Sequence, residues 1–127
     1  MANEFLETEF RCRCLKVVDG DTVDLCVDIG FHVSFTGRFR VLGIDTAEMN
    51  SKDVTERAVA LLAKDKVTEL LKPSPTTTGW PLMVRTKKDP DSFGRWLADI
   101  SYFLLDGTKL GLGPMLILER LAKPYKG

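Results

Sequence analysis

The stretch that decides the fold is EFRCRCLKVVDGDTVDLCVDIGFHVSFTGRFRVLGI, residues 9–44. Apolar side chains alternate with polar ones in residues 9–18 and again in residues 22–29, which predicts two half-buried β-strands. Asp19-Gly20-Asp21 is a turn sequence between them. Residues 31–44 form a third β-rich stretch, in which Gly37 and Gly43 are the expected bend or bulge points. Because the three segments follow one another closely, a meander is the simplest arrangement.

A helical pattern follows this β-rich region. Val54–Leu71 carries apolar residues at the spacing of one amphipathic helix. Asp53 followed by Glu56 predicts a capping box at its start, and Pro73 and Pro75 stop the helix.

The rest of the chain adds two more strands and a short helix. Residues 82–86 and Trp96–Phe103 predict the strands, and residues 115–121 predict the helix. This order predicts an α+β, mainly β fold: a five-stranded OB-fold barrel, with one long helix between strands 3 and 4 and a short C-terminal helix. With 127 residues, we expect residues 1–127 to form a single domain.

Composition narrows the classes of partner. The chain has 18 Lys and Arg residues and 18 Asp and Glu residues, so its formal net charge is zero. A protein with a broad basic face is usually more positive, so either nucleic acid is not the partner or the positive charge is concentrated in one site. No stretch is apolar enough for a membrane helix, and the acidic N-terminus does not resemble a secretory signal. We expect a cytoplasmic monomer that does not bind membranes.

The three cysteines and the single histidine leave two interpretations open. Cys12 and Cys14 would lie on the same face of a strand, as a metal or redox pair or as small apolar residues that line the barrel. Cys26 completes an odd count, which favours reduced thiols. His32, beside two apolar residues, is a packed or exposed side chain or one with a catalytic or metal-binding role, and no His/Cys zinc set can be assembled.

Five charged residues lie where strands begin or end: Asp21, Arg40, Asp45, Glu48 and Arg95. Phosphodiester cleavage needs a hard cation held by oxygen ligands, a base to orient or deprotonate water, and donors that grip the phosphate. Arginine is the best donor for this purpose, because its planar fork matches two phosphate oxygens. These five residues supply the whole set, although each alone is also typical of an ordinary turn, loop or surface.

Three segments resemble the staphylococcal nuclease family in their order and spacing. They are VDGDTV at residues 18–23, FRVLGIDTAE at residues 39–48 and FGRWLADI at residues 93–100. ERLAK at residues 119–123 is similar to part of the family's C-terminal region. The resemblance covers residues 15–123 and implies an OB-fold enzyme that hydrolyses DNA or RNA without sequence preference, depends on Ca²⁺ and leaves 3′-phosphates.

The resemblance also implies roles for individual residues. Asp21, Asp45 and the Thr46 carbonyl match the Ca²⁺ ligands, and Asp19 matches a nearby acid. Glu48 matches the general base or water-orienting residue. The scissile phosphate would be held by a matching pair of arginines, Arg40 and Arg95.

The chain departs from the family at several positions. Ala47 stands where the best-known member has proline. Ser92-Phe93 replaces a Lys-Tyr pair, which removes a positive charge and a hydroxyl. The chain ends early, and Phe93 and Tyr125 are the candidates for substrate contact. The alternatives are a nuclease-like OB-fold module that has lost activity and binds nucleic acid or protein, and a single-strand binder, which would favour aromatic and basic residues.

Other basic and aromatic residues have two interpretations each. Arg85, Lys87 and Lys88 would track a phosphate backbone or form an exposed strand end. Trp80 and Trp96 fit the core or the barrel rim better than a platform for bases.

Overall fold

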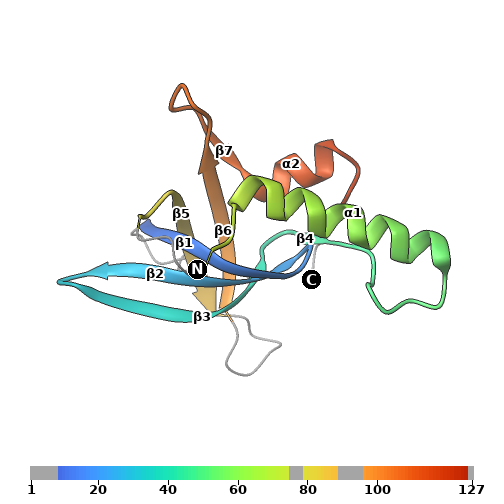
Figure 1. Ribbon diagram of the computed structural model, residues 1–127, viewed down its shortest axis with the longest axis horizontal. Helices are drawn as coiled ribbons and strands as arrows, with labels where there is room; N and C mark the ends of the chain where they lie inside the picture. The colour runs from blue at the N-terminus through green and yellow to red at the C-terminus, as the bar shows by residue number, and fades with distance from the viewer. Residues whose placement is uncertain (1–8, 75–78, 89–95, 126–127) are drawn as a thin grey trace, which may run out of the picture.

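The computed structural model describes residues 9–74, 79–88 and 96–125. Five strands form the barrel: β1 (Phe10–Asp19), β2 (Thr22–Gly30), β3 (Val33–Val41), β5 (Leu82–Lys88) and β6 (Trp96–Phe103) (Figure 1). One further strand, β7 (Lys109–Gly111), extends the sheet beside β6. A separate two-stranded sheet pairs β4 (Ile44–Asp45) with β8 (Lys123–Pro124). The two helices are α1 (Val54–Leu71) and α2 (Leu112–Leu118).

The barrel closes between two strands that are far apart in sequence. Neighbours in the order β3-β2-β1-β5-β6 are antiparallel. The last contact is parallel and aligns Phe39 with Trp96 and Val41 with Ala98. Five strands closed in this order, with α1 between β3 and β5, form an OB-fold barrel. The predicted fold class, α+β and mainly β, is confirmed.

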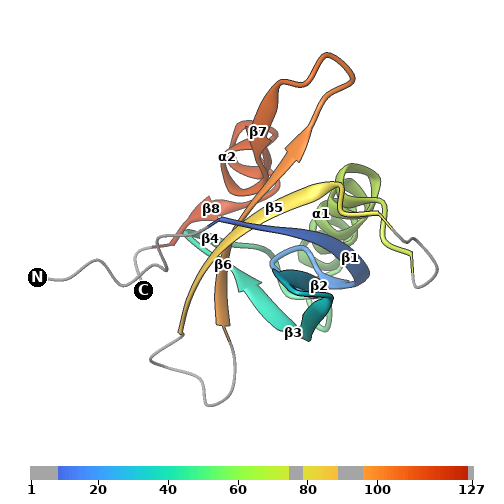
Figure 2. The same cartoon turned by 90° about the vertical axis from the view of Figure 1, so that its left-hand side faces the viewer.

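The core fills the barrel and the space under α1. Val23, Leu25 and Phe39 alternate inward from β2 and β3, while Val67 and Leu71 of α1 complete the same cluster. Helix α1 lies across β1 (Figures 1 and 2). Full burial of a side chain of this size contributes roughly 2 kcal/mol, so the helix is held mainly by this face.

The cysteines belong to the core. Cys12, Cys14 and Cys26 are free and buried, and the first two face into the barrel cluster. Burial raises the pKa of the Cys12 thiol to about 12 and that of Cys14 to about 11. Of the two interpretations of Cys12 and Cys14, their burial in the barrel cluster favours small apolar residues that line the barrel.

The start of α1 differs from the predicted capping box. Asp53 is the N-cap, and its carboxylate accepts a hydrogen bond from the Thr55 amide at 2.9 Å. Glu56 does not bond back to the Asp53 amide, which instead donates to the Ser51 hydroxyl at 3.1 Å. The capping-box prediction was therefore wrong in its second half, because Ser51 satisfies that amide and leaves Glu56 for the preceding loop.

The β-rich stretch of residues 31–44 is not one strand. Phe31 and His32 form the turn between β2 and β3, and Gly43 turns the chain between β3 and β4 with φ +80°. Gly37 is neither a bend nor a bulge, because it pairs with Leu25 in an uninterrupted part of the register. An added Cβ at Gly37 would lie 2.8 Å from the Phe35 ring, so packing accounts for this glycine.

The last helix begins and ends three residues earlier than predicted. Helix α2 spans Leu112–Leu118 instead of residues 115–121. Pro114 is tolerated in the first turn, where backbone amides have no helical partner. The helix cannot continue to residue 121, because Arg120 adopts a left-handed conformation with φ 62°.

Candidate functional site

The turn between β1 and β2 fixes Asp21. Asp19 pairs with Thr22 across this turn, and an added Cβ at Gly20 would lie 2.8 Å from Ala63 of α1. The Asp21 carbonyl accepts from the Val41 amide at 2.8 Å, while one carboxylate oxygen accepts from the Thr22 hydroxyl at 3.1 Å. The close packing and these bonds hold the Asp21 carboxylate toward the end of β3.

Arg40 lies between Asp21 and Asp45, the two aspartates that the sequence predicts as metal ligands. Its Nη2 lies 3.6 Å from Asp45 Oδ1 and 3.9 Å from Asp21 Oδ2, and it donates to the Ile44 carbonyl at 3.1 Å. The side chains of Asp21 and Arg40 are 13% and 19% exposed, whereas that of Asp45 is 56% exposed. The guanidinium therefore offsets two carboxylates at a site that is open to solvent on the Asp45 side.

Thr46 closes this cluster through its backbone. Its amide donates to Asp21 Oδ2 at 3.4 Å, so the strand that carries Asp45 and the turn that carries Asp21 are joined directly. Asp21, Arg40, Asp45 and Thr46, four of the residues predicted from sequence, come together here.

The C-terminal segment brings Tyr125 to the same cluster. Strand β8 pairs Lys123 with Asp45, and the Tyr125 amide donates to the Gly43 carbonyl at 2.9 Å. The Arg40 guanidinium carbon lies 4.9 Å from the centre of the Tyr125 ring. A cation–π contact thus places this predicted substrate residue beside the predicted phosphate-binding arginine.

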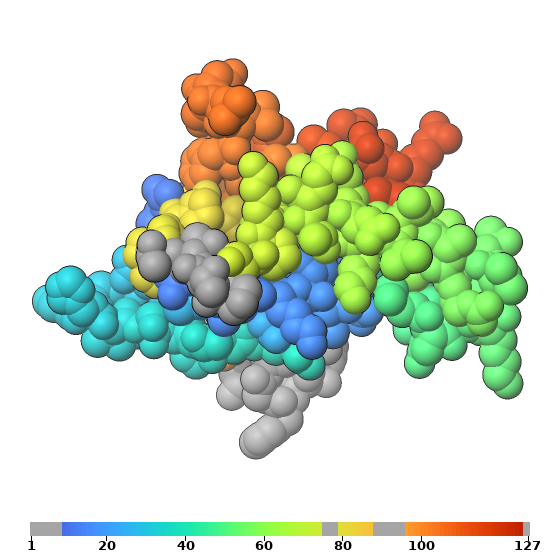
Figure 3. Space-filling view, in the orientation of Figure 1, coloured from blue at the N-terminus to red at the C-terminus, as the bar shows by residue number. Residues whose placement is uncertain are grey.

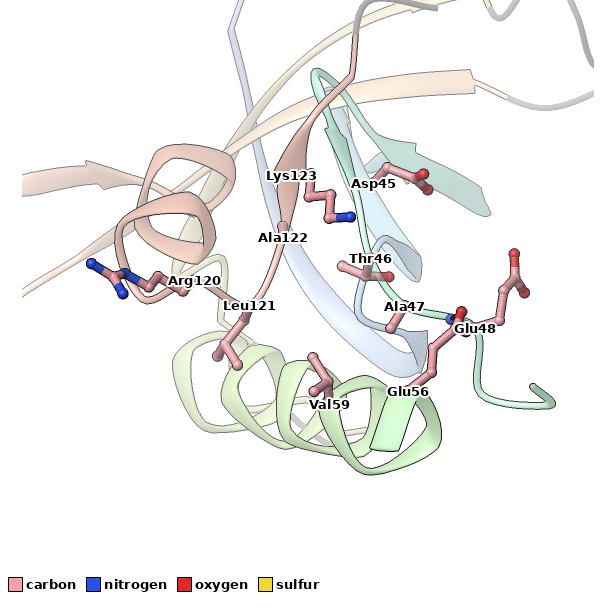
Figure 4. Close-up of a pocket in the computed structure, with 10 residues that line it drawn as sticks. All are labelled: Asp45, Thr46, Ala47, Glu48, Glu56, Val59, Arg120, Leu121, Ala122 and Lys123. Atoms are coloured by element: carbon pink, nitrogen blue, oxygen red, sulfur yellow. Dashed lines mark hydrogen bonds between the residues drawn. The ribbon is translucent and has the colours of Figure 1, made fainter. Parts of the chain in front are cut away.

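Glu48 lies in the next loop and is held by Glu56. The Glu56 carboxylate accepts from the Glu48 amide at 3.3 Å and from the Ser51 hydroxyl at 2.9 Å. The Glu48 side chain is exposed and extends away from helix α1 (Figure 4). Within the described residues its carboxylate forms no ion pair, so Glu48 is near the cluster without joining it.

A pocket of about 420 Å³ adjoins the cluster. It lies between the loop after β4, helix α1 and the C-terminal segment (Figure 4). Asp45, Thr46 and Glu48 line one wall, and Lys123 and Arg120 lie on the opposite wall. Lys123 points toward the strand that carries Asp45 and Thr46, whereas Arg120 points away (Figure 4).

The donor set suits a hard cation. Asp21 and Asp45 face one guanidinium nitrogen, so two carboxylates are gathered at one place. Ca²⁺ prefers carboxylate and carbonyl oxygens and accepts irregular geometry. Across the described ranges there is no cluster of three or more His, Cys, Asp or Glu residues that could hold a metal. A cation here would therefore need further oxygens from the substrate or from water.

Several sequence predictions lie outside the described residues, namely those for Arg95, Phe93 and Ser92. Arg85 belongs to the basic stretch in β5, and its guanidinium lies 3.8 Å from the Asp99 carboxylate on the neighbouring strand β6. Trp96 is partly buried against the core, as expected for the barrel rim.

Sequence reasoning missed two residues near the cluster. Lys123 was noticed only as part of a family-like segment, and its position opposite Asp45 comes from the pairing of β4 with β8. Glu56 was assigned to a capping box, which is a local pattern and carries no information about Glu48 eight residues earlier.

The chain matches no family model and none of the curated proteins with which it was compared. No helix in the described ranges is long and apolar enough to cross a membrane.

Proposed function

We propose that this chain is a Ca²⁺-dependent phosphodiesterase that hydrolyses DNA or RNA without sequence preference. The observation that carries the proposal is the position of Arg40 between Asp21 and Asp45, with Tyr125 against its guanidinium. An arginine, paired carboxylates and an aromatic ring at an open site suit a phosphate, a cation and a nucleoside. The resemblance to the staphylococcal nuclease family assigns the same residues.

Each residue has a distinct role in this proposal. Arg40 donates two N–H groups to oxygens of the scissile phosphate, together with Arg95, whose role rests on the sequence alone. Glu48 orients a water molecule and accepts its proton. The hydroxyl adds to phosphorus, the bond from phosphorus to the 5′-oxygen breaks, and that oxygen takes up a proton from solvent as it leaves. The product strand then carries a 3′-phosphate.

Asp21, Asp45 and the Thr46 carbonyl would hold the Ca²⁺. When bound, the ion offsets negative charge that develops on the phosphate oxygens. The residues themselves keep Arg40 in place before substrate arrives, because both carboxylates and the Ile44 carbonyl contact its guanidinium. Such preorganised donors reduce the reorganisation needed during reaction.

Cleavage of plasmid and of single-stranded DNA tests the proposal. We expect cleavage with Ca²⁺, less with Mg²⁺ and none in excess chelator. Asp21→Ala and Asp45→Ala should remove nearly all cleavage while the barrel still folds, since removing one acid also relieves like-charge repulsion. Equal cleavage in chelator, or a folded Asp21→Ala variant that cuts at the parent rate, would refute the proposal.

A second candidate is a nuclease-like module that binds nucleic acid or protein without cutting. Glu48 favours it, because its carboxylate is exposed and forms no ion pair within the described residues. Nucleic-acid binding without cleavage in Ca²⁺ would select this candidate.

A further inference from the structure

A second pocket, of about 490 Å³, lies at the opposite end of the β2–β3 hairpin from Asp21. The hairpin projects from the rest of the molecule, whereas Asp21 precedes the other end of β2 (Figures 1 and 3). The length of β2 separates the two places by about 25 Å. The pocket is lined by Arg13, Trp80 and hairpin residues that include Phe31, His32 and Ser34.

Arg13 brings to this pocket a cation that has no ion-pair partner among the described residues. Its guanidinium carbon lies 4.4 Å from the centre of the Trp80 ring. Its Nε is buried and has no hydrogen-bond partner within the part of the chain that the structure describes. Among the described residues the guanidinium takes part in no ion pair, in contrast to Arg38 and Arg40. The ring thus holds in place a guanidinium that has no anionic partner among the described residues and can offer its terminal N–H groups to an anion.

The turn at the pocket rim has an unusual sequence for its conformation. Phe31 and His32 both have positive φ, 57° and 61°, between the paired residues Gly30 and Val33. Two-residue turns of this kind favour Asn-Gly, because bulky side chains are strained there. The Phe31 side chain is 98% exposed, so its burial offers nothing to offset the strain. The fold therefore presents a phenyl ring and an imidazole at the rim of the pocket that the Arg13 guanidinium lines.

We propose that this pocket binds one nucleotide of a single-stranded polynucleotide, as a second contact remote from the cleavage site. This inference rests on the proposed function, since the strand would be the nuclease substrate. Arg13 and Ser34 would hold a phosphate, and a base would stack on Phe31. Stacking on an aromatic side chain is tolerant of sequence and so fits a nuclease that does not read bases.

The acid in the pocket restricts where the phosphate lies. One oxygen of Asp28 accepts from the Gly30 amide at 3.0 Å, which keeps this carboxylate within the hairpin. A phosphate is thereby directed toward Arg13 and away from Asp28. An acidic peptide could form an ion pair with Arg13 but has no planar base to stack on the exposed ring of Phe31. A nucleotide offers both a phosphate and a base, so it fits better.

The fluorescence of Trp80 provides a direct test. The chain has two tryptophans, so Trp96→Phe leaves Trp80 as the only one. We would titrate this protein with sixteen-nucleotide oligothymidylate in excess chelator, where binding is measured without cleavage. The expected result is quenching of Trp80 fluorescence. Arg13→Gln should weaken binding about tenfold or more, because it removes the phosphate contact.

Two further variants make the test specific. Phe31→Ser should weaken binding several-fold and leave the fold intact, since this side chain is almost fully exposed. Arg38→Gln removes the same charge from an exposed side chain of the hairpin and should change affinity less than threefold. Absence of quenching, or parent affinity in folded Arg13→Gln and Phe31→Ser variants, would overturn the proposal. Displacement of the oligonucleotide by an equal concentration of polyglutamate would overturn the assignment to a nucleotide.

The two proposals fail separately. A parent protein that never cleaves DNA in Ca²⁺ would refute the nuclease proposal and leave the Trp80 titration in chelator interpretable. Conversely, if the protein cleaves DNA but the oligonucleotide does not quench Trp80 fluorescence, the nuclease proposal stands and only the second contact is refuted.

Discussion

Arg40→Lys tests the cleavage site most directly, because it keeps the positive charge and removes the planar fork. In the folded protein Arg40 donates to the Ile44 carbonyl at 3.1 Å and contacts the Tyr125 ring at 4.9 Å. Lysine would keep part of each interaction, so we expect a loss of about 1 kcal/mol in the free energy of unfolding. For a domain of this size, the melting temperature would fall by about 4 °C.

Turnover should respond far more strongly than stability. The phosphate gains negative charge as water adds, so a two-pronged donor is worth most in the transition state. By analogy with loss of one oxyanion donor, Arg40→Lys should lower kcat about 10²-fold, or about 2.7 kcal/mol in the activation barrier. Single-turnover cleavage of DNA at saturating Ca²⁺, beside a thermal melt, measures both effects.

Arg38→Lys is the matched control. Arg38 lies two residues away on β3 and is bonded to Asp24 at 2.8 Å and 3.2 Å, so it should tolerate lysine without loss of turnover. A folded Arg40→Lys variant with near-parent kcat would refute the phosphate role of Arg40, even if the protein is a nuclease.

Three further predictions concern the fold. The hydrogen bond from Arg38 lowers the pKa of Asp24, so this pair stabilises the folded protein above the ordinary pKa of Asp, about 3.9, and the benefit is lost as pH falls below it. Melting temperatures of the parent and of Asp24→Asn should therefore converge between about pH 4 and pH 2; a gap that persists in acid would contradict this. The buried thiols of Cys12 and Cys14 should resist alkylation at pH 8 until denaturant is added, as mass spectrometry can show; rapid native labelling would count against their burial. Gly43→Ala should cost about 1–2 kcal/mol in chemical denaturation, since φ is +80° there; an unchanged midpoint would show that the turn relaxes.

The sequence determined the elements of the fold well, because they depend on local periodicity. Alternating residues in β1 and β2, and the helical spacing of α1, reflect which side chains face the core. The error at Glu56 arose because its side chain has more than one possible partner. Glu56 fits a capping box by spacing, yet the Ser51 hydroxyl and the Glu48 amide are within its reach in the folded chain.

The sequence also selected Asp21, Arg40 and Asp45, because strand ends with paired acids and an arginine match the chemistry of phosphate transfer. Only the tertiary structure decided that one guanidinium lies between both carboxylates, since this depends on the register that aligns Thr22 with Arg40. The same holds for Tyr125, which reaches Arg40 through the pairing of β8 with β4. Contacts between segments so far apart in sequence leave no local pattern, because they are set by how the barrel closes and not by neighbouring residues.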